Sequence, residues 1–295
     1  MTQLTRRSLL LAAPALALPS LGVAASAADE LAGIEKASGG KMGVCVLDTA
    51  TGATLAWRAD ARFPFCSSFK APLAAFVLWK ADRGQLRLDR SIRYDAADLL
   101  SYVPITRAHV ADGRMSVEQL CAAAVAYSDN TAANLLLRET GGPAALTAWM
   151  RARGDRAFNL ASNEPRLNLS RYGDATDTTT ARAMAESYRR FVLGDVLTPA
   201  SRTKLAGWLV ANTTGDRRLR AGLPHAWRVG DKTGTFGGEW FSTIDIAVAW
   251  PPARPPLVIA GLITGPNDTA SAERALVQVA RTAAIWAGRQ RPPRD

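Results

Sequence analysis

The sequence of 295 residues is poor in the side chains and loops that bind metals and phosphates. It contains only two histidines and three cysteines, and the histidines, His109 and His225, form no His-x-His pair. Because zinc is held by clustered histidine, cysteine and carboxylate ligands, a zinc-dependent hydrolase is not a candidate. A glycine-rich phosphate loop is also missing, and we expect no cofactor.

The chain also lacks an apolar run that would make a stable membrane anchor. The run from Leu9 to Leu21 is short, is interrupted by two prolines and follows Arg6 and Arg7. The small residues Ala25-Ser26-Ala27 would suit a signal peptidase, so residues 1–27 are predicted to be an export signal. The arginine pair favours a twin-arginine signal over an ordinary secretory one. We therefore expect a periplasmic or secreted protein.

Acidic side chains are outnumbered by basic ones. The sequence has 26 Asp and Glu against 36 Lys and Arg, a formal net charge of +10. A basic protein could bind nucleic acid, but outside helices of the surface type no run of basic residues is interleaved with aromatic ones. Nucleic acid is therefore not an expected partner. A basic cleft would instead attract a small anionic substrate.

Strand-like patterns lie near both ends of the sequence, and helical patterns fill the middle. The expected strands are 41–48, 54–58, 227–231, 242–250 and 257–264. The expected helices are one from residue 67, one capped by Ser116 with Gln119, and 130–140, 143–154, 178–193, 199–212 and 272–289. This order predicts an α+β protein in which residues 28–62 and 212–295 form a mixed domain, with an inserted all-α domain of residues 63–211.

Four short motifs follow one another in an order that chance rarely supplies. They are Ser67-Ser68-Phe69-Lys70, Ser128-Asp129-Asn130, Glu164-Pro165-Arg166-Leu167-Asn168 and Lys232-Thr233-Gly234. Together they offer a nucleophile, candidate bases, a proton shuttle and a carboxylate anchor, as needed to open a strained cyclic amide through an acyl-enzyme. A second Ser-x-x-Lys occurs at 201–204, but only the first begins a strongly apolar helix.

In these motifs the chain resembles the class A serine β-lactamases, relatives of the penicillin-binding transpeptidases and carboxypeptidases. The resemblance runs from about Gly39 to the last helix. It implies a five-stranded antiparallel sheet flanked by helices, an inserted all-α domain, and an active site in the cleft between them. It also implies a monomer that hydrolyses the β-lactam amide of penicillins and cephalosporins through a serine acyl-enzyme, and so confers β-lactam resistance.

The resemblance assigns roles in acylation to the first two motifs. Ser67 and Lys70, one helical turn apart, share a helix face, so the amine can take the proton of the hydroxyl. Ser128 passes a proton to the leaving nitrogen, and Asn130 holds the substrate's side-chain amide and contacts Lys70. Asp129 is expected to brace the loop through backbone amides. Taken alone, this second motif would read as an ordinary helix cap.

Glu164 and Asn168 are expected to hold the water that hydrolyses the acyl-enzyme. The alternative is a solvated glutamate in a surface loop. The chain departs from the family here, because Ser162 stands where relatives carry an arginine that pairs with the aspartate matched by Asp177. The loop must therefore be held in another way, and Ser162 and Arg166 are the candidates.

The last motif resembles the family's substrate-carboxylate site. Lys232 supplies charge, Thr233 and Thr235 supply hydroxyls, and Gly234 lets the substrate lie against the strand. The backbone N–H groups of Ser67 and Thr235 would form the oxyanion hole. Two further substrate-binding candidates, Arg218 on the carboxylate side and Tyr102 as an aromatic gate, follow from the same resemblance.

The resemblance also bears on the cysteines and on other functions. Some carbapenem-hydrolysing relatives pair a cysteine matching Cys66 with one at the position of Phe236, so we expect no disulfide here. A peptidoglycan D-Ala-D-Ala carboxypeptidase or penicillin-binding protein would use the other motifs but leave Glu164 idle. A β-lactam sensor that is acylated once would need a transmembrane or signalling segment, for which the sequence gives no pattern.

Overall fold

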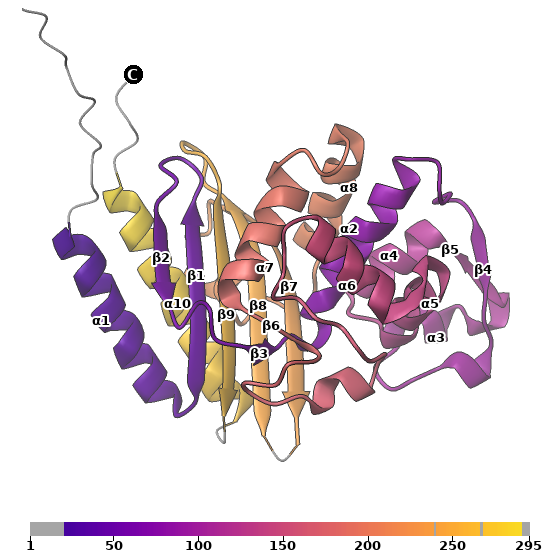
Figure 1. Cartoon of the computed structure of the whole chain (residues 1–295), viewed down its shortest axis with the longest axis horizontal. Coiled ribbons are helices and arrows are strands. Elements are labelled where there is room, and N and C mark those ends of the chain that lie inside the picture. Colours follow the sequence, from indigo (N-terminus) through magenta and orange to yellow (C-terminus); the bar gives the residue numbers. More distant parts are fainter. Residues whose placement is uncertain (1–20, 239, 266–267, 291–295) are drawn as a thin grey trace, which may run out of the picture.

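The structure is a computed structural model that describes residues 21–238, 240–265 and 268–290 (Figure 1). Most of the predicted export signal, residues 1–20, lies outside the described residues. Residues 21–27 belong to the first helix, α1 (Leu21–Ser38). The sequence reading gave no helix there, because it treated this stretch only as an export signal and the residues that follow it.

A five-stranded antiparallel sheet forms the body of the protein, as expected. Its strands are β1 (Lys41–Asp48), β2 (Thr54–Trp57), β7 (Arg228–Gly237), β8 (Phe241–Trp250) and β9 (Leu257–Gly265), in the order β2-β1-β9-β8-β7. Strand β7 lies at the sheet edge and is longer than predicted, because it continues to Gly237 in full register with β8. The Lys232-Thr233-Gly234 motif therefore lies inside a strand.

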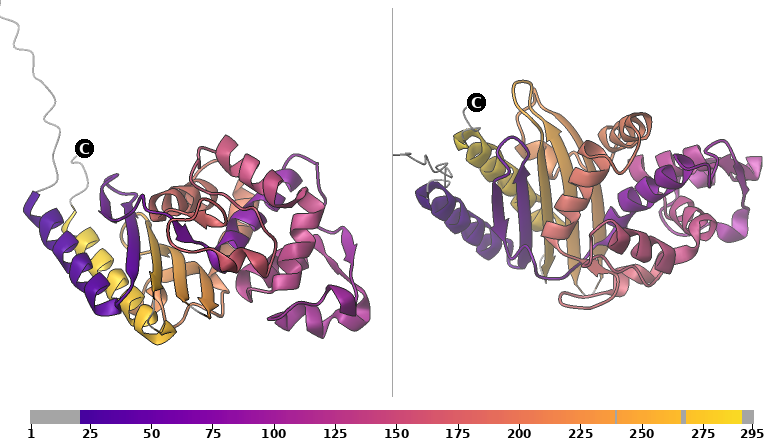
Figure 2. Two further views of the ribbon diagram at one scale, coloured as in Figure 1. Left: turned by 60° about the horizontal axis from the view of Figure 1, so that its bottom comes forward. Right: turned by 45° about the horizontal axis from the view of Figure 1, so that its top comes forward.

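Both faces of the sheet are covered, which explains why β1, β8 and β9 are almost entirely buried. Met42, Val44 and Val46 pack with α1 and α10 (Thr269–Arg289), which lie side by side on one face (Figures 1 and 2). Cys45 and Leu47, which alternate with them, join the core on the opposite face. Helix α7 (Ala181–Tyr188) covers this second face next to β1 and β9.

The segment between β2 and β7 is mainly helical. Its helices are α2 (Lys70–Ala81), α3 (Pro104–Ala108), α4 (Val117–Ala126), α5 (Asn130–Thr140), α6 (Gly142–Ala152), α7, α8 (Pro199–Val210) and α9 (Leu219–Gly222). Helix α2 is buried from Lys70 to Leu78 and is the central helix of this region. The predicted capping box of Ser116 and Gln119 begins α4, and Gly141 ends α5 in a left-handed conformation.

Short elements complete this region. They are the paired strands β3 (Phe63–Pro64) and β6 (Thr178–Thr179), the paired strands β4 (Ser91–Arg93) and β5 (Arg114–Ser116), and the 3₁₀ turns η1 (Cys66–Phe69), η2 (Ala96–Asp98), η3 (Val110–Asp112) and η4 (Arg166–Leu169). The single helix predicted over 178–193 is wrong. Its first two residues pair with β3, Thr180 caps α7, and α7 runs into a π turn, η5 (Arg189–Leu193).

The observed fold does not separate the two predicted domains sharply. The strands of the main sheet come from both ends of the sequence, and most of the helical segment between them in the sequence stands to one side of the sheet (Figure 2). One apolar core nevertheless extends from β1, β8 and β9 into α2 and α4. The division into 28–62 with 212–295 and 63–211 stays a prediction. Among the described helices, none combines the length and apolar character needed to cross a bilayer.

Candidate active site

A cavity of about 680 Å³ lies where the helical region meets β7. Its walls come from η1, the α4–α5 junction, the loop before β6, the segment after α8, and β7, so elements distant in sequence meet there. The lining residues are Ser67, Tyr102, Ser128, Asn130, Glu164, Asn168, Thr213, Thr214, Asp216, Arg217, Arg218, Thr233, Thr235 and Glu273. Most of the predicted site residues therefore share one cleft.

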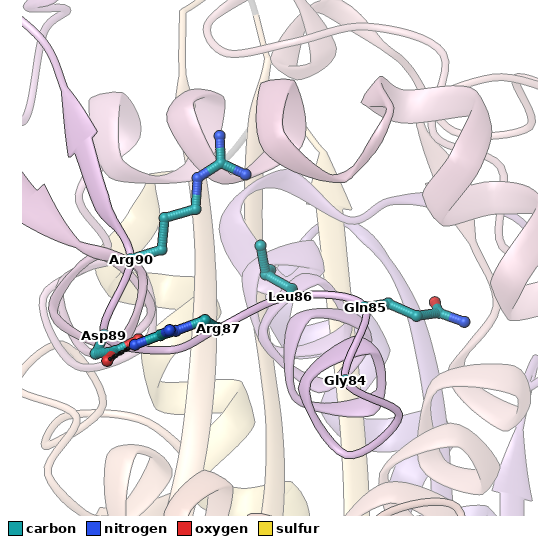
Figure 3. A pocket seen from close by; sticks show the side chains of 6 residues that line it. All are labelled: Gly84, Gln85, Leu86, Arg87, Asp89 and Arg90. Carbon is teal, nitrogen blue, oxygen red and sulfur yellow. Dashed lines mark hydrogen bonds and ion pairs between the residues drawn. The ribbon is translucent and has the colours of Figure 1, made fainter.

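Another pocket, of about 420 Å³, shares no lining residue with this cleft (Figure 3). It is formed by residues 84–90 of the loop that follows α2. The charged side chains of Arg87 and Asp89 are exposed and pair with each other at 2.6 Å. A pocket built from one solvated loop with a self-paired ion pair offers no group for chemistry, so we assign the reaction to the larger cleft.

Ser67 and Lys70 meet at the start of α2. Ser67 lies in η1 and Lys70 is the first residue of α2, and the Lys70 ammonium donates a hydrogen bond to Ser67 Oγ at 2.9 Å. Lys70 is fully buried and also bonds the Ser128 carbonyl (2.8 Å) and Asn130 Oδ1 (2.5 Å). Burial lowers the pKa of Lys70, and the nearby Glu164 carboxylate partly opposes this. A lysine with a lowered pKa can act as a base toward the hydroxyl.

The Ser128-Asp129-Asn130 segment joins α4 to α5. Asp129 caps α5, and its carboxylate accepts from the backbone N–H groups of Ala132 and Thr106, which confirms its bracing role. Ser128 has a left-handed backbone (φ +59°), and its hydroxyl accepts from Lys232 Nζ at 3.0 Å. Burial, and secondly the charge of Lys70, hold the pKa of Lys232 well below its usual range. A proton can therefore move between Lys232 and the Ser128 hydroxyl.

Glu164 and Asn168 close the other side of the nucleophile. Glu164 Oε1 lies 3.3 Å from Ser67 Oγ and 3.2 Å from Lys70 Nζ. Asn168 Nδ2 donates to Glu164 Oε2 at 2.7 Å. Asn168 Oδ1 is buried and has no protein partner within the described structure. The carboxylate and the amide oxygen therefore both remain as acceptors for a water molecule beside the serine.

The loop that carries Glu164 is held through its backbone. Asp177 Oδ1 accepts from the N–H groups of Ala161 (2.8 Å) and Ser162 (2.9 Å). The aspartate therefore anchors the loop through these backbone groups, although the arginine that pairs with it in relatives is replaced by Ser162. Of the two expected candidates, Ser162 takes part through its backbone N–H, and the exposed Arg166 makes no such contact within the described structure.

A second anchor of this loop, Asn134, was missed by the sequence reading. It accepts from the Glu164 N–H (3.0 Å) and donates to the Glu164 carbonyl (2.9 Å). Its only sequence signal is its place one helical turn after Asn130 on α5, which puts both side chains on the same face of the helix.

Gly234 meets a packing constraint that the sequence expectation did not include. A Cβ there would lie 2.5 Å from the Phe65 carbonyl oxygen and 3.2 Å from the Ser67 nitrogen. The glycine thus allows β7 to lie against η1, which carries the nucleophile. Its expected role in leaving room for substrate stays a prediction. Side chains alternate between the two faces of a strand, so those of Thr233 and Thr235 point away from the face that position 234 occupies, and they line the cleft.

Arg218 braces the cleft wall from beneath. It is buried and donates to Thr235 Oγ1 (2.6 Å), to the Gly234 carbonyl (3.0 Å) and to the Ile244 carbonyl (2.9 Å). Glu273 at the start of α10, which sequence reasoning missed, lies 3.4 Å from the guanidinium. Tyr102 stands at the mouth of the cleft with 60% of its surface exposed and φ of +55°. The geometry therefore suits Arg218 for holding Thr235 and Tyr102 for touching substrate.

The three cysteines, Cys45, Cys66 and Cys121, are buried free thiols. Burial raises the pKa of the Cys66 thiol far above neutral, so this neighbour of Ser67 does not compete as a nucleophile. Among the described residues, no group of three or more histidine, cysteine or carboxylate side chains is arranged to hold a metal ion.

Comparisons with known proteins agree with this geometry. The model of the β-lactamase enzyme family matches residues 26–287. The chain is 45% identical to the carbapenem-hydrolyzing β-lactamase KPC of Klebsiella oxytoca (95% of this chain, 96% of the relative) and 48% identical to the β-lactamase L2 of Stenotrophomonas maltophilia (88% and 86%). It superimposes on the class A β-lactamase of the last common ancestor of Gram-negative bacteria with a TM-score of 0.85 and 54% identity, covering 88% of this chain and 98% of that one.

The fold and the serine-centred cleft are those of a hydrolase that works through an acyl-enzyme. The chain belongs to the class A β-lactamase family.

Proposed function

We propose that this class A β-lactamase, a hydrolase of the β-lactam amide, is acylated at Ser67 and is released from the acyl group by water that Glu164 activates. One observation carries the proposal. Ser67 Oγ lies within hydrogen-bonding distance of two candidate bases, Lys70 Nζ at 2.9 Å and Glu164 Oε1 at 3.3 Å. A nucleophile in contact with both groups has one base for each half of the reaction, provided the two act in turn.

Acylation begins when Ser67 loses its proton and attacks the lactam carbonyl. Lys70 receives that proton directly, or Glu164 receives it through a water, and both groups are within reach. The backbone N–H groups of Ser67 and Thr235 would stabilise the oxyanion. Ser128, bonded to Lys232, would return a proton to the nitrogen as the C–N bond breaks. The product of this step is a serine ester whose acyl group still carries the former lactam nitrogen as an amine.

Substrate binding in this scheme uses the β7 side of the cleft. Lys232, Thr233 and Thr235 would hold the substrate carboxylate, and Arg218 would support it by fixing Thr235 at 2.6 Å. Asn130, whose side chain also bonds the Ser101 carbonyl, would contact the side-chain amide of the substrate, and Tyr102 would cover it. Gly234 would contribute by letting β7 approach Ser67.

Deacylation uses the other side of the cleft. Glu164 would remove a proton from water held jointly with Asn168 Oδ1, and the resulting hydroxide would attack the ester carbonyl. Ser67 then regains its proton. The alternative activity, a D-Ala-D-Ala carboxypeptidase, leaves Glu164 without a role although its carboxylate contacts both the nucleophile and Lys70.

The decisive experiment is Glu164→Gln with a chromogenic cephalosporin. We expect the variant to be acylated at Ser67 and to accumulate the adduct, seen by intact-mass spectrometry, while steady-state hydrolysis falls by about 10²–10⁴-fold. Glu30→Gln, on the exposed side of α1, is the matched control and should hydrolyse normally. Unchanged steady-state hydrolysis by Glu164→Gln would refute the proposal.

We further propose a monomer that takes small β-lactams, binds no nucleic acid and is exported by residues 1–27 through a twin-arginine signal. Support comes from the Arg6-Arg7 pair, from the apolar run after it and from the family resemblance. Replacing both arginines with lysine should abolish export of active enzyme if the signal is of the twin-arginine type. An ordinary secretory signal would tolerate the change, and fractionated activity assays would show it.

A further inference from the structure

The loop that carries Asn168 touches the β7–β8 turn on the far side of the cleft. The guanidinium of Arg171 lies 4.2 Å from the ring centroid of Trp240, within the range of a cation–π contact. The Trp240 ring in turn lies 5.2 Å from that of Phe236, the residue next to Thr235 in β7. An unbroken chain of contacts therefore links the wall that holds substrate to the loop that supplies the water ligands.

The position of Asn168 depends on what holds the loop on either side of it. Before Asn168, the loop is fixed by the two bonds between Asn134 and Glu164 and by the fully buried Leu167. Among the described residues, the side chain of Asn168 bonds Glu164 and the Pro165 carbonyl, both within the loop. Contacts outside the loop must therefore fix its placement relative to Ser67.

After Asn168, the Gly173 N–H donates to the Arg62 carbonyl at 3.0 Å, which ties the loop to the segment before β3, and the loop also makes two aromatic contacts. Tyr172 meets Phe63 edge to face at 4.9 Å, which ties the loop to β3. Arg171 lies over Trp240, which ties the loop to the turn of the sheet. Of these two contacts, only the second connects the loop to β7, the strand that carries Thr233 and Thr235.

We propose that Arg171 and Trp240 are a positioning pair for deacylation. Their contact sets the distance between the Glu164–Asn168 segment and β7, so that the water ligands and the acyl group bound along β7 stay aligned. The proposal rests on the deacylation roles given above to Glu164 and Asn168. Misplacement of a catalytic group by a fraction of an ångström slows the step it serves, whereas Ser67, Lys70 and Ser128 are fixed by other elements and should acylate normally.

The test separates the two steps. Trp240→Ala and Arg171→Met are mixed with a chromogenic cephalosporin, and acylation and decay of the acyl-enzyme are measured in single turnovers. We expect deacylation to slow about 10-fold and acylation to stay within about twofold. Trp240→Phe keeps a ring and loses an Nε1 that has no protein partner within the described structure, so it should restore the rate; Arg171→Lys should restore it in part.

The chain offers a matched control. Arg228 lies 4.6 Å over the ring of Trp250, a contact of the same kind between the far ends of β7 and β8. Arg228→Met should leave both steps unchanged. Because Arg171 is exposed, Arg171→Met should fold even if Trp240→Ala does not. If Trp240→Ala fails to fold, the deacylation rate of Arg171→Met tests the proposal.

The outcomes distinguish this proposal from the function it rests on. If Arg171→Met deacylates at the wild-type rate, or loses acylation and deacylation equally, the positioning pair is refuted, while trapping by Glu164→Gln still supports the function. If Glu164→Gln hydrolyses normally, the proposed function is refuted whatever the Arg171 and Trp240 variants do.

Discussion

The two sides of the cleft are built in different ways. On the acylation side, Ser67, Lys70, Ser128 and Lys232 stand on η1, α2, the α4–α5 junction and β7, and both lysines are fully buried. On the deacylation side, Glu164 and Asn168 stand on a loop, and Asn168 lies in its short 3₁₀ turn η4. The backbone of this loop is bonded by the side chain of Asn134 on α5 and by the side chain of Asp177 at the loop's own end.

The difference teaches where each side is vulnerable. The acylation side depends on buried amines whose pKa burial lowers, so it should fail when an amine is removed. The deacylation side depends on the placement of a loop, so it should fail when a remote anchor is removed although no catalytic group is touched.

The largest effect should follow from Lys70→Met, which removes the buried amine and keeps most of the side-chain volume. Acylation should slow by about 10³-fold or more, because Ser67 loses its nearest base and its hydrogen bond. Single-turnover kinetics measure this. Acylation within tenfold of wild type would assign the base to Glu164 alone.

Asn134→Ala should produce the next largest effect and confine it to the other side of the cleft. The variant loses both bonds to the Glu164 backbone, so deacylation should slow by about 10–100-fold while acylation changes little. Accumulation of acyl-enzyme by mass spectrometry is the measurement. Equal loss of both steps would show that Asn134 supports the whole site and has no special link to the loop.

Asp177→Ala should destabilise the loop more than the protein as a whole. It leaves the N–H groups of Ala161 and Ser162 without their acceptor, at a cost of about 1–3 kcal/mol. Hydrogen exchange should show lost protection at these amides, and urea unfolding gives the global effect. Asp177→Asn keeps the accepting oxygen and is the control; equal loss in both variants would contradict the backbone-anchor account.

The smallest effect concerns a buried acid behind the acylation side. Asp245, opposite Thr233 in the sheet, accepts from the Leu219 N–H but has a second oxygen without a partner in the described structure. Burial, and secondly Asp231, hold its pKa well above the ordinary value. Above about pH 4 the folded protein therefore keeps a proton that the unfolded chain releases, and stability falls as the pH rises towards the raised pKa.

Asp245→Asn should remove this slope. Between pH 5 and pH 8, the free energy of unfolding of the wild type should fall more steeply than that of the variant. Urea unfolding at the two pH values measures it. Parallel behaviour of the two proteins would mean that Asp245 is ionised in the folded state throughout this range.

Local sequence patterns predicted most of the elements that carry the acylation residues, because local rules determine helices and strands. Residue patterns gave the strands β1 and β2 and the helix α5 nearly within their observed bounds, and spacing placed Ser67 beside Lys70. The five-stranded antiparallel sheet followed from the family resemblance and is confirmed.

On the deacylation side, the sequence predicted Glu164 and Asn168 but not the contacts that hold them. Asn134 and the backbone role of Asp177 were out of reach, because these contacts join a loop without periodicity to residues 15 to 30 positions away. The packing of Gly234 against η1 and the position of Glu273 beside Arg218 could not be predicted either, because both contacts form where elements distant in sequence meet. Sequence patterns report which groups are present, and tertiary packing decides how they are held.

The pairing of β1 with β9 makes activity depend on the completion of synthesis. Lys41 is paired with Thr264 in the register of β1 and β9, so a strand made early and a strand made late must find each other before the sheet closes. Every side chain proposed to act on substrate has been made by Thr235, yet β8 and β9, which complete the sheet, have not been made at that point. A nascent chain stopped before β9 would thus contain all the catalytic groups and remain inactive.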